Sequence, residues 1–281
     1  MKRQVMEIAT RDVFCLPQTS TIMNALKSML KKNFRRVPIV DIGTKRLHGI
    51  ISATDLLNFL GGGEKHKLIE DRYNGNLSAA VNAEIKEIME RDVIAVRDDS
   101  TVEEVVEVMF EKRVGGCPIV NKEDKLVGIV TESDIVRFLS KQREIDGYVS
   151  DYMTKGVVTV KPSESIRDAM KKMIEKKFRR LPIIDEGVLL GMVTVREILR
   201  YFGKDAFKKL ITGNIKDVID VPISTLIDFF RAPLTFPIDA KISQVVSAMI
   251  EKGYGSALIV EDERLEGIIT ERDIVRFLYN I

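Results

Sequence analysis

The 281-residue sequence predicts an α/β (α+β) protein built from four copies of one β-α-β-β-α unit. Three observations lead to this prediction. An amphipathic helical stripe recurs four times, a β-branched run follows each stripe at constant distance, and a Gly-x-x-[Ser/Thr] turn precedes a second apolar helix in every copy. Each unit spans about 50 residues, which is too short to bury a core alone, so we expect neighbouring units to share one.

Each copy opens with a short strand, predicted at residues 13–16, 93–96, 157–160 and 233–236. The first helix follows, because apolar residues at i, i+3, i+4, i+7 and i+8 form one buried face. The four stripes are Ile22, Ala25, Leu26, Met29, Leu30; Val102, Val105, Val106, Met109, Phe110; Ile166, Ala169, Met170, Met173, Ile174; and Ile242, Val245, Val246, Met249, Ile250. We interpret their methionines as core residues rather than a cofactor site.

Two strands and a second helix complete the unit. Nine residues after the methionine of each stripe come Pro38-Ile39-Val40, Pro118-Ile119-Val120, Pro182-Ile183-Ile184 and Leu258-Ile259-Val260, which predict a strand. The next strand ends in Gly49-Ile50-Ile51-Ser52 or its counterparts at 128–131, 191–194 and 267–270. In the first copy, Leu56, Leu57, Phe59 and Leu60 predict the second helix.

The lengths of the connections predict how the copies pair. From the last apolar residue of one copy to the next first strand there are 33, 18 and 31 positions. We expect the long connections to cross within a pair and the short one to join two pairs, with a boundary near residue 147. The first pair is then 1–146, with copies at about 1–63 and 84–146, and the second is 147–281, with copies at about 147–203 and 214–281.

Composition excludes several classes of protein. A formal net charge of +2 gives no overall attraction for nucleic acid, and no aromatic platform with interleaved basic residues occurs. No apolar run reaches membrane-spanning length, and no signal-peptide core opens the chain. The two cysteines, Cys15 and Cys117, are too few for a disulfide scaffold. We therefore expect a cytoplasmic protein. Neither a nucleophile–base pair, a histidine metal motif nor a P-loop is present; we predict no enzyme activity, metal or catalytic cofactor.

The repeated unit resembles the CBS domain, the cystathionine-β-synthase-type repeat. The resemblance is carried by Gly-[Ile/Met]-[Ile/Val]-[Ser/Thr]-x-x-[Asp/Glu] before each last helix, and by lead-in segments at 85–89 and 149–153. CBS units pair into Bateman modules, and two modules forming a disc resemble the γ subunit of AMP-activated protein kinase. The resemblance implies AMP, ADP or ATP in the clefts between paired units, and a kinase or other regulated protein as partner of a monomer or homodimer.

Each copy has a hydroxyl and a carboxylate three residues apart at the start of its last helix. By the resemblance, Asp55, Asp134, Asp273 and Glu197 would hold ribose, since a carboxylate can accept hydrogen bonds from both hydroxyls of a diol. Glu197 departs from the pattern by one methylene. The hydroxyls assigned to ribose or phosphate are Ser52, Thr131, Thr194, Thr270, Thr54 and Ser133. The competing interpretation is a capping box, in which the acid binds the backbone of its own helix.

Phosphate requires cations. Arginine pairs precede a strand in the first and third copies, and small residues occupy the same positions in the second and fourth. Arginine provides a planar fork for phosphate oxygens, and glycine permits a close approach of the backbone. The predicted phosphate ligands are Arg35, Arg36, Arg179, Arg180, Arg113, Arg196 and Arg272. Surface arginines that form weak salt bridges are the alternative.

An adenine ring needs an apolar slot with backbone hydrogen bonds. Residues of the strands are the candidates, although core packing is the stronger interpretation for the apolar ones. They are Ala95, Val96, Thr159, Val160, Gly115, Gly116, Pro38, Ile39, Pro118, Ile119, Pro182, Ile183, Gly255 and Ile259. The connection containing Lys65, His66, Arg72 and Tyr73 is a weaker candidate for an additional anion site.

The prediction is therefore a regulatory protein that senses adenine nucleotides. Two alternatives stay open. One is a sensor of S-adenosylmethionine, whose sulfonium cation and lack of phosphate would suit the arginine pairs poorly. The other is a CBS scaffold or nucleic-acid-binding protein.

Overall fold

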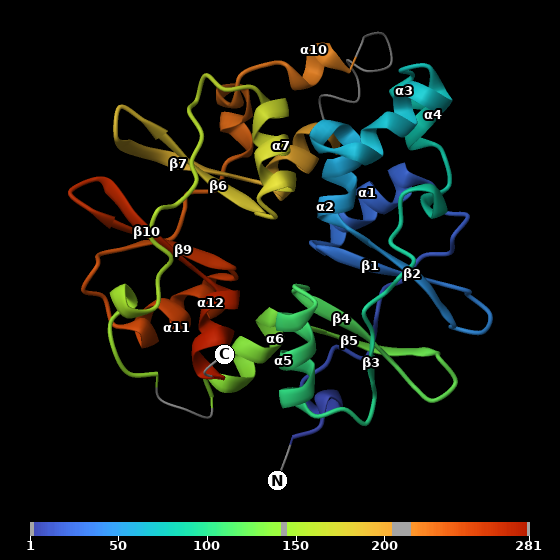
Figure 1. The fold of residues 1–281 in the computed structure, drawn as a ribbon, viewed down its shortest axis with the longest axis horizontal. Helices are drawn as coiled ribbons and strands as arrows, with labels where there is room; N and C mark the ends of the chain where they lie inside the picture. Colours follow the sequence, from blue (N-terminus) through green and yellow to red (C-terminus); the bar gives the residue numbers. More distant parts are fainter. Residues whose placement is uncertain (1–2, 142–144, 204–214, 280–281) are drawn as a thin grey trace.

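The computed structural model describes residues 3–141, 145–203 and 215–279, so residue 214 and the last two residues of the predicted fourth copy lie outside it. Four β-α-β-β-α repeats surround the centre of a disc, one in each quadrant (Figure 1). We number them in chain order. The predicted fold class is confirmed.

Repeats 1 and 2 follow the predicted element order. Repeat 1 contains η1 (Val5–Glu7), α1 (Ile22–Lys32), β1 (Arg36–Val40), β2 (Leu47–Ser52) and α2 (Ala53–Leu57). Repeat 2 contains η4 (Ile85–Glu87), β3 (Val96–Arg97), α5 (Val102–Glu111), β4 (Gly116–Val120), β5 (Leu126–Thr131) and α6 (Glu132–Leu139). The connection between them holds a π turn, η2 (Asn58–Gly62), followed by η3 (Glu64–His66), α3 (Lys67–Tyr73) and α4 (Leu77–Val81).

Repeats 3 and 4 have the same order. Repeat 3 contains η5 (Val149–Asp151), α7 (Ile166–Glu175), β6 (Arg180–Asp185), β7 (Val188–Thr194) and α8 (Val195–Tyr201). The connection contains α10 (Lys216–Ile219) and η7 (Ile223–Phe229). Repeat 4 contains β8 (Thr235–Phe236), α11 (Ile242–Lys252), β9 (Ser256–Glu261), β10 (Arg264–Thr270) and α12 (Glu271–Leu278). None of the helices in the described residues is long and apolar enough to cross a membrane.

The first strands are shorter than predicted. In repeats 2 and 4 they are the two-residue strands β3 and β8, which pair in parallel with β4 and β9. In repeats 1 and 3 each is a single parallel bridge, from Leu16 to Ile39 and from Val160 to Ile183. The apolar pattern therefore predicted which residues meet the sheet, but backbone pairing continues over only one or two residues.

The first four residues of each predicted stripe are buried, the last one (Leu30, Phe110, Ile174 or Ile250) is half-buried, and the stripes build cores that each span two repeats. One core unites repeats 1 and 3, where α2 packs on α8 and α7 packs on η2; the other unites repeats 2 and 4, where α6 packs on α12. Sheets make the remaining contacts. The hairpins of repeats 1 and 2 exchange backbone hydrogen bonds, with Leu126 N donating to Lys45 O at 2.9 Å, and Leu189 N of repeat 3 donates to Glu263 O of repeat 4 at 3.3 Å.

These contacts close a ring in the order 1–2–4–3, which leaves repeats 1 and 4, and repeats 2 and 3, in opposite quadrants (Figure 1). In this arrangement the second helix of each repeat (α2, α6, α8 and α12) faces the centre of the disc. The start of the strand that follows the first helix (β1, β4, β6 and β9) faces it as well. The sheet contacts join repeat 1 to repeat 2 and repeat 3 to repeat 4. The division into modules at 1–146 and 147–281 stays a prediction.

Candidate functional site

A cavity of about 1130 Å³ lies at the centre of the disc and is lined by residues of all four repeats. A second cavity of about 370 Å³ adjoins it and shares Arg35, Arg36, Gly115 and Arg196 as lining residues. The central cavity brings together many predicted site residues: Arg35, Arg36, Ser52, Thr54, Asp55, Arg113, Gly115, Gly116, Arg179, Arg180, Thr194, Arg196, Glu197, Gly255, Arg272 and Asp273. The second cavity adds Thr131, Ser133 and Asp134. Thr270 lines neither cavity, although it caps the helix that carries Asp273.

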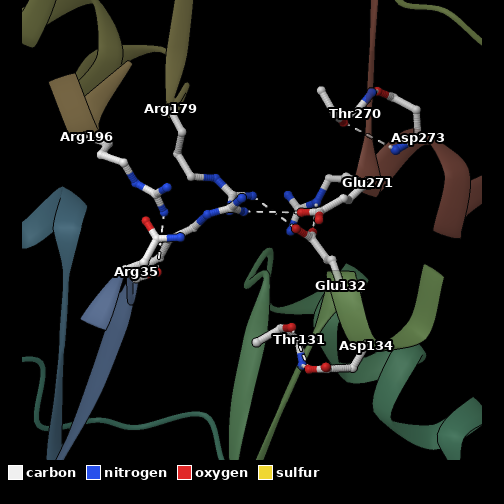
Figure 2. A network of polar contacts seen from close by, with 11 residues as sticks. Arg35, Thr131, Glu132, Asp134, Arg179, Arg196, Thr270, Glu271 and Asp273 are labelled. Atoms are coloured by element: carbon white, nitrogen blue, oxygen red, sulfur yellow. Dashed lines mark hydrogen bonds and ion pairs between the residues drawn. The ribbon is translucent and has the colours of Figure 1, made fainter. Parts of the chain in front are cut away.

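Three of the four predicted ribose acids form capping boxes. In each, one carboxylate oxygen accepts hydrogen bonds from the backbone N–H and the hydroxyl of the capping residue, at 2.8 and 2.6 Å for Asp55 with Ser52. Asp134 with Thr131 and Asp273 with Thr270 repeat this geometry (Figure 2). The capping interpretation is therefore correct for one oxygen of each carboxylate. Only the other oxygen is available for a further partner.

The second oxygen differs among the three acids. Asp55 Oδ1 accepts a hydrogen bond from Lys65 Nζ at 2.6 Å. Asp134 Oδ1 lies 3.9 Å from Arg137 Nη1, and Asp273 Oδ1 accepts a long hydrogen bond of 3.4 Å from Thr154 Oγ1. Asp134 and Asp273 thus keep a weakly held oxygen, whereas Asp55 has both oxygens engaged.

Glu197 does not reproduce the capping box. Its longer side chain places Oε2 against the Thr194 hydroxyl, and Thr194 instead accepts a hydrogen bond from Arg196 N. Oε1 lies 3.9 Å from Arg200 Nη1, and the residue is 5% exposed. The extra methylene thus gives repeat 3 a different carboxylate geometry.

The two arginines of each pair reach different repeats, one repeat 2 and the other repeat 4. Arg36 of repeat 1 and Arg179 of repeat 3 both reach repeat 2, where Arg179 Nη2 lies 3.0 Å from Glu132 Oε2. A Cβ atom on Gly115 would lie 2.6 Å from Glu132 Oε2 and 2.8 Å from Arg36 Nη2, so glycine leaves room for both side chains.

Repeat 4 receives the other two arginines. Arg35 Nη1 lies 3.2 Å from Glu271 Oε2 (Figure 2). A Cβ atom on Gly255 would lie 2.8 Å from Arg35 Nη2 and 3.2 Å from Arg180 Nη2. The small-residue repeats thus accept one arginine from each half of the chain.

Two of these arginines are left without a close anion. Within the described residues, the guanidinium groups of Arg36 and Arg180 make no hydrogen bond and no ion pair within 4 Å; their backbones pair in the β1–β2 and β6–β7 ladders. Burial and the nearby Arg179 lower the pKa of Arg36 to about 10, and burial with Arg35 and Arg179 lowers the pKa of Arg180 to about 9. Both side chains remain cations at neutral pH, so the centre of the disc holds concentrated positive charge that an anion would relieve.

A family comparison identifies the repeat. The model of the CBS domain matches residues 5–62, 85–141, 149–204 and 226–280. The chain belongs to the CBS domain family. Protein MJ1225 of Methanocaldococcus jannaschii is 33% identical over 98% of both chains. Its crystal structure, described as that of a candidate archaeal homologue of γ-AMPK, superposes with a TM-score of 0.92 over 98% of this chain and 99% of that one.

Two solved CBS pairs match about half of this chain. The structure of CBSX2 of Arabidopsis thaliana in complex with AMP is 25% identical, with a TM-score of 0.42, and covers 50% of this chain and 99% of that one. The CBS pair of protein MJ0100 in complex with 5′-methylthioadenosine and S-adenosylmethionine is 29% identical, with a TM-score of 0.39, and covers 48% and 98%.

Two buried glutamates in the CBS repeats were not anticipated as site residues. Glu132 and Glu271 follow the capping threonines and are 3% and 7% exposed. Burial acts to raise the pKa of Glu132, but Arg179 and Arg272 outweigh it and hold the pKa below its ordinary value. Arg272 Nε donates to Glu132 Oε1 at 2.8 Å. The sequence shows these glutamates only as ordinary first-turn acids, because their partners lie in other repeats.

Ser256 is a further residue that sequence reasoning did not assign. It begins β9, lines the central cavity and is 1% exposed. Among the described residues, its hydroxyl is the buried side-chain oxygen that has no hydrogen-bond partner. A buried hydroxyl without a partner is costly, so a ligand atom at this point would be stabilising. The only signal in the sequence was a small residue after Gly255.

Most of the predicted adenine residues lie elsewhere. Ile39, Ile119, Ile183 and Ile259 are between 0% and 2% exposed and pack in the two large cores. Of the predicted adenine set, Gly115, Gly116 and Gly255 line the cavities described above, whereas the strand residues Ala95, Val96, Thr159, Val160, Pro38, Ile39, Pro118, Ile119, Pro182, Ile183 and Ile259 line neither. Apolar cavity walls come instead from Ile50, Ile94, Phe110, Met192 and Tyr254.

The candidate anion site in the first connection is occupied by carboxylates. Arg72 Nη1 lies 3.1 Å from Glu87 Oε2, and the Tyr73 hydroxyl donates to the same oxygen at 3.0 Å. His66 Nδ1 lies 3.0 Å from Phe59 O. In the described part of the chain, no group of three His, Cys, Asp or Glu residues could hold a metal ion.

Proposed function

We propose that this CBS protein is a non-catalytic regulatory protein that binds adenine nucleotides between its repeats. Asp134 and Asp273 hold the ribose hydroxyls, and the phosphates extend to the central arginines. The observation that carries the proposal is the convergence of both arginine pairs on the central cavity, which Asp273 lines, while Asp134 lines the second cavity that adjoins it. AMP, ADP and ATP share the ribose and differ in phosphate, the part of the ligand that the centre of the disc would recognise.

The charge of the cavity supports a phosphorylated ligand. The basic residues of its lining outnumber the acidic ones: Arg35, Arg36, Arg113, Lys176, Lys177, Arg179, Arg180, Arg196, Arg231, Arg272 and Arg276, against Asp55, Glu90, Asp92, Glu111, Glu197 and Asp273. S-adenosylmethionine carries a sulfonium cation and no phosphate, so this lining favours a nucleotide over that ligand. The cavity of about 1130 Å³ also exceeds the roughly 300–1,000 Å³ usual for one small ligand, which suits phosphates arriving from more than one cleft.

Regulation requires a ligand to bind two arrangements of the repeats with different affinities. The phosphate position in repeat 2 is built from Arg36 and Arg179, and that in repeat 4 from Arg35 and Arg180. A bound phosphate would therefore favour the arrangement in which both halves of the chain contact it. A kinase subunit or another regulated protein that reads this arrangement is the partner we propose, in keeping with the description of MJ1225.

Isothermal titration of the full chain with AMP, ADP, ATP, adenosine and S-adenosylmethionine tests the proposal. We expect AMP to bind at least 10-fold more tightly than adenosine, because the arginines add charge-assisted hydrogen bonds to phosphate. Equal affinity for adenosine and AMP would contradict the phosphate assignment. Binding of S-adenosylmethionine alone would replace the proposal with the alternative sensor.

A further inference from the structure

The first CBS repeat carries the same Ser–Asp capping box as repeats 2 and 4, yet its surroundings differ. We infer that Lys65 occupies the ribose position of repeat 1 and excludes nucleotide from it. This inference rests on the proposed function for the other repeats. Asp55 Oδ2 is held by the backbone and hydroxyl of Ser52, and Oδ1 accepts from Lys65 Nζ at 2.6 Å, so neither oxygen is left for a diol.

Three contacts fix the lysine. Its backbone N–H donates to Asn58 Oδ1 at 2.8 Å, and Nζ donates both to Asp55 Oδ1 and to Ile88 O at 2.7 Å. Gly63 makes room for this arrangement, because a Cβ atom there would lie 2.8 Å from Asn58 Oδ1. The backbone of Lys65 is therefore positioned before its side chain binds, which reduces the entropy lost on forming the ion pair.

The contact is also sheltered from solvent. The side chains of Lys65 and Asp55 are 28% and 21% exposed, and Ile88 is 1% exposed. For ribose to bind Asp55, its neutral hydroxyls would have to replace a charge-assisted hydrogen bond and leave a half-buried ammonium without its carboxylate. The exchange is unfavourable on both counts.

Asp134 and Asp273 lack an equivalent clamp. The neighbour of Asp134 Oδ1 is Arg137, which is 55% exposed and 3.9 Å away, and the hydrogen bond from Thr154 to Asp273 is 3.4 Å long. A diol can displace either partner at small cost. The three acids that look alike in the sequence therefore have two roles, with Asp55 joining repeat 1 through Lys65 to the lead-in of repeat 2.

Calorimetric titration of AMP into Lys65→Met tests the inference, with Lys67→Met as the matched control because Lys67 is an exposed lysine of the same connection. We expect Lys65→Met to bind one more AMP per chain than the wild type. Adding Asp55→Ala to Lys65→Met should remove the additional site, and Lys67→Met should keep the wild-type stoichiometry. Unchanged stoichiometry in Lys65→Met, or loss of a wild-type site in Asp55→Ala alone, would overturn the inference.

A ligand-free measurement separates this inference from the proposed function. If the ion pair holds, Lys65→Met lowers Tm by about 2–4 °C more than Lys67→Met, and the difference disappears in an Asp55→Ala background. Absence of this coupling overturns the lysine clamp even if AMP binds. Absence of AMP binding to the wild type with the coupling intact means instead that the proposed function has failed.

Discussion

Arg179 Nη2 of repeat 3 lies 3.0 Å from Glu132 Oε2 of repeat 2, and this ion pair spans two opposite quadrants of the disc (Figures 1 and 2). The pair between Arg35 of repeat 1 and Glu271 of repeat 4 spans the other diagonal. Neither pair follows the sheet or helix contacts that close the ring. The two glutamates thus neutralise part of the positive centre, in the place that we propose phosphates take.

In this arrangement, the proposed phosphate positions of repeats 2 and 4 each depend on arginines from both halves of the chain. A phosphate that binds near Gly115 would compete with Glu132 for Arg179, and one near Gly255 would compete with Glu271 for Arg35. Because buried ion pairs have discrete arrangements, such an exchange is a way for nucleotide to shift the repeats relative to one another.

Asp134→Ala distinguishes ribose binding from simple helix capping. We expect AMP affinity at repeat 2 to fall about 10- to 150-fold, the equivalent of roughly 1.5–3 kcal/mol for a set of charge-assisted contacts. Asp168→Ala is the matched control, because Asp168 forms the same capping box with Ser165 but lines neither cavity. Both variants should lose about 1 kcal/mol of stability from the cap. An equal effect of the two on AMP, measured by calorimetry, would assign Asp134 to capping alone.

Asp134→Asn should separate stability from binding. Burial raises the pKa of Asp134 above its ordinary 3.8, despite hydrogen bonds from Thr131 that lower it. The folded state therefore binds the proton more tightly than the unfolded state, so stability falls as pH rises through this window and the penalty persists at neutral pH. An uncharged asparagine removes the penalty. We expect Tm at pH 7 to equal or exceed that of wild type while AMP binding is lost; a lower Tm together with intact binding would be the opposite outcome.

The sequence predicted the local features well and the long-range ones poorly. In the helical stripe of Ile22 to Leu30 the first four residues are buried and Leu30 is half-buried, since periodicity reports which face meets a core. The Ser52–Asp55 pair was equally local, and both of its interpretations, cap and ligand, could be stated in advance.

The contacts that separate those interpretations are not local. Lys65 reaches Asp55 from the following connection, and Glu132 meets Arg179 from 47 positions away. No spacing rule predicts such pairs, because the ring order of the repeats decides which side chains face one another. For the same reason, the arginine pairs were predicted to be phosphate ligands without any indication that each pair divides between repeats 2 and 4.

Arg179→Ala tests the dependence of repeat 2 on repeat 3. We expect AMP to bind about 10-fold more weakly at the Asp134 site, with adenosine unaffected, because a phosphate contact and not a ribose contact is removed. Arg97→Ala is a suitable control, since Arg97 forms an exposed ion pair with Asp124. A double-mutant cycle should give additive effects on AMP binding for Arg179 with Asp273, but coupled effects for Arg179 with Asp134. Coupling to neither acid would contradict the proposed division of the arginines.

Glu132→Gln should strengthen phosphate binding and weaken the acid-dependent part of stability. Because glutamine carries no charge, Arg179 and Arg272 no longer have a competing anion at position 132. We therefore expect AMP to bind about 3- to 10-fold more tightly. Since the folded-state pKa of Glu132 is below the ordinary 4.5, its ionised form stabilises the fold. That contribution is present above about pH 4.5 and is lost as pH falls through the lower, folded-state pKa.

The corresponding measurement is Tm across pH 3–7 for wild type, Glu132→Gln and the exposed Glu103→Gln. Wild type and Glu103→Gln should lose stability in parallel on acidification. Glu132→Gln should start lower at pH 7 and converge on them at the acid end. Parallel curves for all three proteins would show that Glu132 contributes nothing to acid-dependent stability.

Ser256→Ala tests whether the Ser256 hydroxyl serves ligand binding or the packing of the core. Among the described residues the Ser256 oxygen is buried without a hydrogen-bond partner, so removing it should raise stability by about 1 kcal/mol, seen as a Tm increase of about 2–4 °C. The same change should weaken AMP at repeat 4, where Arg35 and Arg180 approach Gly255. An exposed serine, Ser163, provides the control substitution, which should alter neither quantity. Because the stability and the affinity are expected to move in opposite directions, a general loosening of β9 cannot mimic the result, and a fall in both would mean that the hydroxyl serves the fold.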